Sequence, residues 1–199
     1  MAGGNTDDLT KKERNDLKRE EKQREYRKSS RIKKIKKWSF RIFWVGIAIC
    51  GLYWVMNAAQ TANENRPGKA VPIMNRDHIN VGDYDGVYNS NPPTSGPHAG
   101  PAPWGFSSEE ILDENAIHNI EHGGIWISYK DLDNDSIERL RNIAQENSLS
   151  VVVSPRDRNS TKVAVVSWGR LMEFDSVDGE LIADFIKSNK NKSPEPLAR

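Results

Sequence analysis

The feature that most constrains this 199-residue chain is an apolar run between Trp38 and Ala59. Arg41 is the only charged residue in the run and lies close to its N-terminal edge, where its long side chain can reach the interface. A helix needs about 20 apolar residues to cross the hydrocarbon core of a bilayer. Trp38 and Trp54 stand where interfacial aromatic anchors belong. The run therefore predicts one transmembrane helix over residues 38–59.

The segment before the run distinguishes a membrane anchor from a cleaved signal peptide. Residues 1–37 form a long charged arm, and no convincing small-x-small cleavage site follows the run, so an uncleaved anchor is favoured. The arm holds 14 Lys and Arg against 7 Asp and Glu, whereas residues 58–199 hold 14 basic and 21 acidic residues. The two ends of the chain are therefore expected in different surroundings.

The basic residues beside the run predict its orientation. Five lie on the N-terminal side, whereas two, Arg66 and Lys69, follow on the other side. The five are Lys33, Lys34, Lys36, Lys37 and Arg41. The positive-inside rule places the N-terminus in the cytoplasm and everything after residue 60 outside it, as a single-pass protein of the plasma membrane. The arm then acts as an orientation signal that also lies on the lipid bilayer, and no nucleic-acid partner is expected.

Composition divides the chain into five parts. Thr10 and Glu13 have the spacing of a capping box and predict the start of a charged helical arm. Cys50, the single cysteine, lies in the apolar run, so the rest of the chain must be held by its own core rather than by disulfides. The parts are a basic cytoplasmic arm (1–37), a transmembrane helix (38–59), a polar linker (60–74), an extracytoplasmic domain (75–188) and a disordered tail (189–199).

Residue patterns in the 75–188 domain predict both strands and helices. Ser107 to Glu110 has capping-box spacing and predicts the start of a helix that Gly123 and Gly124 end. Strands are predicted over 74–88 (with a turn, carrying His78), 125–129, 149–154, 163–168 and 171–174, and further helices over 135–147 and 178–188. The last helix is expected to bury Leu181, Ile182, Phe185 and Ile186. The predicted class is α+β, with a central β-sheet and helices packed on it.

The stretch from Asn91 to His98 reads Asn-Pro-Pro-Thr-Ser-Gly-Pro-His, and five of the ten prolines lie between Pro92 and Pro103. Proline rings fix φ, so such a loop has little freedom left to lose and presents His98 at low entropic cost. The alternative is an ordinary proline-rich connection whose backbone is satisfied by nearby polar side chains.

His118 and His122 are four residues apart, which places both imidazoles on one face of a helix and within reach of one metal ion. A helical projection puts the polar side chains of Glu114, His118, Glu121 and His122 in one arc, with Leu112, Ala116 and Ile120 on the opposite side. Two alternatives stay open. The histidines could cap carbonyls at a helix end, or residues 113–115 could break the helix early.

Two motifs carry a resemblance to a known family. Residues 88–98, Tyr-Asn-Ser-Asn-Pro-Pro-Thr-Ser-Gly-Pro-His, together with residues 118–124, His-Asn-Ile-Glu-His-Gly-Gly, resemble the prokaryotic family known as domain of unknown function 3105. The resemblance covers about residues 75–188. It implies a short cytoplasmic arm, one membrane span and a domain outside, and it implies no established activity. Ala99 stands where many members have an aromatic residue, so one wall of the pocket is expected to differ.

The histidines lead to a functional hypothesis, because all four lie between His78 and His122. We expect an extracytoplasmic metal-binding domain with His98, His118 and His122 as ligands and His78 or Glu121 completing the shell. Imidazole and carboxylate suit copper(II) or zinc, while Met74 and Met172 could add soft ligands for copper(I).

Two alternatives to this hypothesis remain. One is a small metal-dependent hydrolase, for which the pattern H-x-x-E-H makes Glu121 the general base. The other is a cell-envelope interaction module without metal, in which the histidines and Trp104 shape a surface for an unidentified protein partner.

Overall fold

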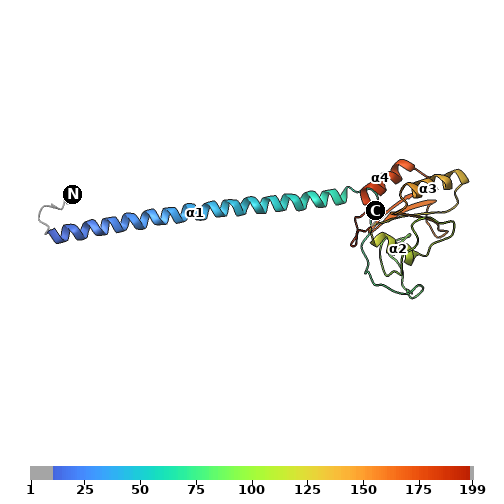
Figure 1. Ribbon diagram of the computed structural model, residues 1–199, viewed down its shortest axis with the longest axis horizontal. Helices are drawn as coiled ribbons and strands as arrows, with labels where there is room; N and C mark the ends of the chain where they lie inside the picture. The colour runs from blue at the N-terminus through green and yellow to red at the C-terminus, as the bar shows by residue number, and fades with distance from the viewer. Residues whose placement is uncertain (1–10, 198–199) are drawn as a thin grey trace. The chain divides into compact units, whose positions relative to one another are not determined.

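The computed structural model describes residues 11–197, so Thr10 of the first predicted capping box lies outside the described residues. The chain divides into two compact units, Met1–Thr61 and Ala62–Arg199. Figure 1 shows the long helix of the first unit and the folded domain of the second.

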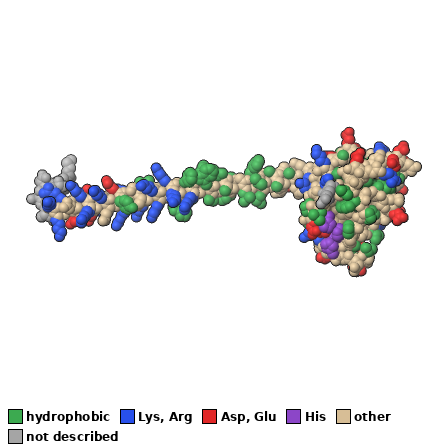
Figure 2. Space-filling model, viewed as in Figure 1, with side chains coloured by type: hydrophobic (Ala, Val, Ile, Leu, Met, Phe, Trp, Pro, Cys, Tyr) green, Lys and Arg blue, Asp and Glu red, His purple; other side chains and the backbone are tan. Residues whose placement is uncertain are grey.

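Helix α1 (Lys11–Glu64) joins the basic arm and the apolar run in one continuous helix of 54 residues. Lys and Arg side chains cover its N-terminal part and hydrophobic side chains follow along its middle (Figure 2). The hydrophobic side chains of Trp44, Leu52 and Trp54 are all exposed, so no protein core covers this part of the helix. By length and composition, α1 is a candidate membrane span.

The second unit is an α+β domain built on a six-stranded mixed sheet in the order β1-β6-β5-β3-β4-β2. The strands are β1 (Lys69–Ala70), β2 (Gly105–Phe106), β3 (Ile125–Tyr129), β4 (Val151–Pro155), β5 (Val163–Ser167) and β6 (Arg170–Phe174). β4 is parallel to β3 and to β2, and the other pairs are antiparallel. A parallel pair needs a crossover connection, and helix α3 (Asn134–Glu146) supplies it between β3 and β4.

Helices cover both faces of this sheet. Ile125 and Ile127 of β3 belong to a core shared with α3 and with α4 (Gly179–Asn189). Trp126, which points to the opposite face, packs against Ala116 and Ile117 of α2 (Asp113–Glu121). All five residues of β3 are buried, as expected of a central strand with helices on both sides.

The structure confirms strands near 125–129, 149–154, 163–168 and 171–174 and helices near 135–147 and 178–188. The strand predicted over 74–88 is wrong: this segment is irregular apart from an isolated bridge between His78 and His98. Two edge strands, β1 and β2, were not predicted. Each has only two residues, too few for alternation to be visible.

The second capping box does not start a helix. The Ser107 hydroxyl instead forms a local turn, accepting from the Glu109 N–H and donating to the Glu109 carbonyl. Helix α2 begins six residues later at Asp113, and Leu112, expected on the buried side, is its exposed N-cap. Leu181 of α4 is likewise exposed, whereas Ile182, Phe185 and Ile186 are buried as expected.

Both segments that flank the predicted domain take part in the fold. Within the predicted linker, β1 pairs with β6, and the Arg170 guanidinium donates to the Arg66 and Gly68 carbonyls. Composition predicts a disordered tail from residue 189. In the structure the Asn191 N–H donates to the Gly123 carbonyl over 2.9 Å, and the Leu197 N–H donates to the His122 carbonyl over the same distance. The carbonyls at and just after the end of α2 have no partner within the helix, and they bind the tail instead.

Candidate metal site

Helix α2 ends at the two glycines of the His-Asn-Ile-Glu-His-Gly-Gly motif. Gly123 has φ +90°, a left-handed conformation that lets the chain turn back after the helix. A Cβ atom on Gly124 would lie 2.5 Å from the Trp104 ring and 2.8 Å from the Asn119 carbonyl oxygen. The motif therefore allows both a sharp helix end and close packing of Trp104.

Polar side chains of α2 hold the proline-rich loop in place. The amide of Asn119 donates to the Ala102 carbonyl and accepts from the Ala102 N–H, at 3.0 and 2.8 Å. The Ala99 N–H donates to the Glu114 carbonyl. His118 Nδ1 lies 2.8 Å from the Ala99 carbonyl oxygen. Several turns of the helix thus position the residues that follow His98.

A buried ion pair fixes the other end of this loop. Arg156 binds Asp113 through two hydrogen bonds of 2.8 Å, Nε to Oδ1 and Nη2 to Oδ2. The same guanidinium donates to Asn91 Oδ1 over 2.6 Å. Sequence reasoning missed Arg156 and Asp113, because 43 residues separate them and neither belongs to a recognisable motif.

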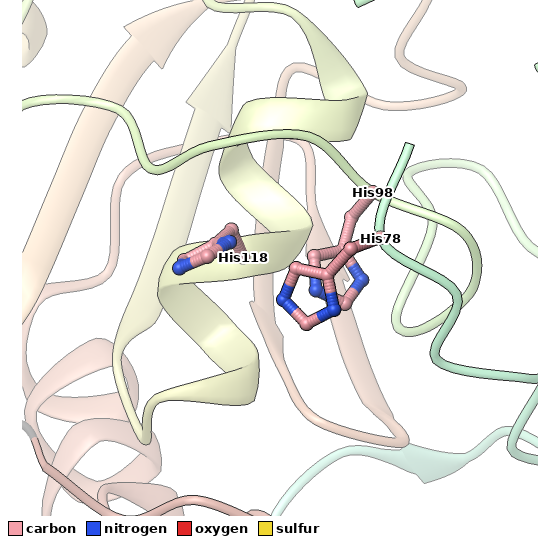
Figure 3. Close-up of side chains that lie close together, drawn as sticks. All are labelled: His78, His98 and His118. Atoms are coloured by element: carbon pink, nitrogen blue, oxygen red, sulfur yellow. The ribbon is translucent and has the colours of Figure 1, made fainter. Parts of the chain in front are cut away.

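Three histidines from separate segments come together in space. His118 projects from α2, while His78 and His98 come from two adjacent chain segments (Figure 3). Ring centroids lie 4.5 Å apart for His78 and His98, 5.3 Å for His98 and His118, and 5.5 Å for His78 and His118. One nitrogen from each residue lies within 4.8 Å of the other two. Histidine side chains that reach the surface form one patch beside acidic side chains (Figure 2).

Backbone carbonyls define the tautomers of two of these histidines. Nδ1 of His98 lies 2.9 Å from the Gly96 carbonyl oxygen, as Nδ1 of His118 does from that of Ala99 at 2.8 Å. A carbonyl can only accept, so each Nδ1 carries the proton and donates it. In the neutral rings each Nε2 then keeps a lone pair for a ligand. This second hydrogen bond is typical of histidines that bind metals.

Glu121 places a carboxylate at the buried side of the histidines. Its side chain is 1% exposed, and Oε2 lies 2.9 Å from His98 Nε2 and 4.0 Å from His78 Nε2. Within residues 11–197, neither carboxylate oxygen of Glu121 has a hydrogen-bond partner of acceptable geometry, and His98 Nε2 has none either. Two groups with lone pairs attract only when they share a proton or a cation. The close contact between His98 Nε2 and Glu121 Oε2 therefore requires a shared proton or a cation.

His122 lies beside this group and belongs to a second one. Its ring centroid is 4.6 Å from that of His118, as their four-residue spacing predicts, although α2 ends at Glu121 and His122 is the C-cap. Donor atoms of Glu121, His122 and Glu195 lie within 4.8 Å of one another. Glu195 is a residue that sequence reasoning missed, because it lies in the segment predicted to be disordered.

The surroundings of His118 favour its neutral form. Burial lowers the pKa of His118 below its ordinary value of 6.5, and repulsion from His122 lowers it further, against the opposing hydrogen bond to Ala99. Neutral imidazole is the form that binds metals. The neutral form of His118, which metal binding would require, is therefore favoured at neutral pH.

A cleft of about 460 Å³ opens beside the histidines. It is lined by Pro101, Trp104, His118, Asn119, His122, Leu149 and Leu197. Glu121 is not among these residues, so a substrate in the cleft would not reach the proposed general base directly. The cleft gives a ligand access to His118 and His122.

The two candidate methionines are placed differently. The sulfur of Met74 lies 3.6 Å from the position that a Cβ on Gly96 would take, close to the loop of His98. Met172 packs against the core on the sheet face that α3 and α4 cover, whereas α2 and His118 lie on the other face. Met172 is therefore not a ligand of this site.

The model of the family described as protein of unknown function DUF3105 matches residues 83–199. The chain belongs to this family. No curated protein and no solved structure matches it.

The DUF3105 match covers most, but not all, of the candidate site. It includes His98, His118, Glu121 and His122, and it continues past the predicted boundary at residue 188 to include Glu195. His78 lies five residues before the match begins. The bridge to His98 nevertheless brings His78 to the site, through the His98 N–H to the Asp77 carbonyl and the Ile79 N–H to the His98 carbonyl.

Proposed function

We propose that this DUF3105 protein binds a zinc or copper ion through His78, His98 and His118, with Glu121 completing the shell. The observation that carries the proposal is the convergence of three imidazole nitrogens within 4.8 Å beside a carboxylate that is 1% exposed. Zinc binds histidine nitrogen and carboxylate oxygen at about 2.0–2.2 Å, and donors on one ion therefore lie about 3–4 Å apart. A small closure of the three rings satisfies this geometry.

The ligand set limits the choice of metal. Nitrogen and oxygen donors suit zinc and copper(II), and the single cysteine, Cys50, lies on α1 rather than in the domain. His122 was expected among the primary ligands of this ion. We propose a place for it at the edge of the site instead, because its donor atom groups with those of Glu121 and Glu195.

We further propose that α1 anchors the domain in the plasma membrane, with the N-terminus in the cytoplasm and the metal site outside. Support comes from the exposed apolar part of α1 and from the basic residues that precede it. Outside the cytoplasm, a site without thiolates also has no cysteine to oxidise.

A metal-dependent hydrolase is a second candidate, and the cleft lined by His118 and His122 is the observation that favours it. An open coordination position beside a cleft is typical of catalytic rather than structural metal sites. Because Glu121 is buried away from this cleft, its role in such an enzyme would be to bind the metal rather than to act as the base.

The test is metal binding to the full-length protein purified in detergent and stripped with a chelator. We expect zinc and copper(II), titrated separately, to bind and to raise the unfolding midpoint. His78→Ala should weaken binding about tenfold or more without loss of fold, because its side chain is 61% exposed. Asn80→Ala, a nearby exposed change, is the control. A wild-type protein that binds neither metal would leave the interaction-module hypothesis in its place.

A further inference from the structure

We infer that the domain holds a second divalent-cation position, formed by Glu121, His122 and Glu195. The inference rests on the proposed function in one respect: Glu121 is shared between this position and the three-histidine site. The donors are two carboxylates and one imidazole, all within 4.8 Å of one another. The chemistry of two oxygens and one nitrogen suits zinc and harder divalent ions such as manganese.

The burial of Glu121 distinguishes this group from acidic residues that merely share a surface. Its side chain is almost wholly buried, and in the described part of the chain neither oxygen has a hydrogen-bond partner of acceptable geometry. Burial of a charged carboxylate without partners costs far more than exposure to water. The His122 Nδ1 atom, also buried, has no hydrogen-bond partner among residues 11–197.

The two oxygens of Glu121 face two different sets of charges. Oε2 lies 2.9 Å from His98 Nε2, within the three-histidine site. Oε1 lies 3.8 Å from the Arg76 guanidinium, which is itself 4.0 Å from Glu195 Oε1. The carboxylate is thus placed to bridge two cations, an arrangement common to two-metal sites.

Arg76 provides positive charge at this position in the metal-free protein. Its contacts of 3.8 and 4.0 Å are too long for hydrogen bonds, and its side chain is 49% exposed. Such a side chain can move into solvent when a divalent ion replaces it. Arg76 therefore competes with the ion, and its removal should strengthen binding.

The main chain positions Glu195. The Glu195 N–H donates to the Glu121 carbonyl over 3.3 Å, and the Leu197 N–H donates to the His122 carbonyl over 2.9 Å. His122 Nδ1 lies 3.7 Å from Glu195 Oε2. The two backbone hydrogen bonds hold the tail beside the two residues with which Glu195 would share the ion.

The experiment counts zinc ions bound per chain to full-length protein in detergent, after chelator treatment and dialysis. We expect two per wild-type chain and one per Glu195→Gln chain. Arg76→Gln should keep two ions and bind the weaker one about three- to tenfold more tightly, because a competing positive charge is removed. Glu138→Gln, an exposed glutamate on α3, is the matched control and should bind two.

The outcomes separate this inference from the proposed function. One zinc per wild-type chain, or two in Glu195→Gln, overturns the second position and leaves the three-histidine site standing. No zinc in the wild type overturns the second position, and it overturns the proposed function as well only if copper(II) also fails to bind. Circular dichroism of Glu195→Gln verifies its fold, and Arg76→Gln, which adds affinity rather than removing it, gives a result that misfolding does not imitate. Unchanged or weaker binding in Arg76→Gln also counts against the second position.

Discussion

Nε2 of His98 lies 2.9 Å from Oε2 of Glu121, and both side chains are buried. The His98 Nδ1 proton is already donated to Gly96, so this contact is favourable only with a second proton or with a cation. A proton would make it a buried imidazolium–carboxylate pair, and a metal ion would make it two ligands of one centre.

Glu121→Gln separates a metal ligand from a structural ion pair. The amide can donate to His98 Nε2, so the metal-free protein should unfold at the wild-type midpoint or above it. The increase in midpoint on adding zinc should be lost or greatly reduced, because the anionic ligand is gone. Thermal unfolding with and without zinc measures both. A loss of about 3–5 kcal/mol in the metal-free protein would instead identify a structural ion pair.

The lowered pKa of His118 predicts how binding and stability depend on pH. The folded protein holds this proton less tightly than the unfolded chain, whose pKa is near 6.5. The contribution of His118 to stability is therefore complete above pH 6.5 and is lost as pH falls from there through the folded-state pKa. Its part in metal affinity should decline over the lower, folded-state range. An NMR titration of the metal-free protein measures this pKa, and a value at or above 6.5 would contradict the prediction.

Arg156→Ala should destabilise the domain strongly. It leaves the Asp113 carboxylate buried without its partner and removes the hydrogen bond to Asn91, at a cost of about 3–5 kcal/mol. Arg158→Ala is the matched control, because Arg158 also contacts Asp113 but is 60% exposed, and we expect a cost of about 1 kcal/mol or less. Urea unfolding measures both. Equal effects would show that the buried pair does not hold the loop.

Gly124→Ala tests the packing behind the helix end. The new Cβ would lie 2.5 Å from Trp104 and 2.8 Å from a backbone oxygen, so the ring and the helix end must shift. We expect a loss of about 1–3 kcal/mol in the free energy of unfolding. Gly100→Ala serves as the control, because no atom lies within 4 Å of its added Cβ. Similar midpoints for the two variants would argue against the close approach.

The orientation proposed for α1 predicts the behaviour of a reporter joined to the C-terminus. An alkaline phosphatase fusion should be active in intact cells, since that enzyme requires an oxidising compartment. A fluorescent protein that folds only in the cytoplasm should stay dark. Replacing the basic residues between Lys33 and Arg41 with glutamine should reduce phosphatase activity, because the charge difference sets the orientation. Activity of the cytoplasmic reporter would contradict both the orientation and the external metal site.

The elements that could be predicted from the sequence are those with a local signal. An apolar run with one charged residue predicted a membrane-spanning helix over 38–59, which lies within the candidate span α1. Local residue patterns predicted α3, α4 and the four longer strands. The four-residue spacing of His118 and His122 placed their rings together, and two motifs identified the family. These features depend on residues only a few positions apart, and helix or strand geometry determines which of their side chains share a face.

Features that depend on residues far apart in the chain could not be predicted and became visible only in the folded structure. The start of α2 at Asp113 accompanies an ion pair with Arg156, 43 residues away. The tail carrying Glu195 is ordered by carbonyls that α2 leaves free at its end. In each of these two contacts, neither segment has a sequence pattern that predicts its partner. These contacts stabilise the protein only once the chain has closed the loops between the partners. Composition at residues 189–199 therefore predicted disorder in the segment where the fold places a candidate ligand, Glu195.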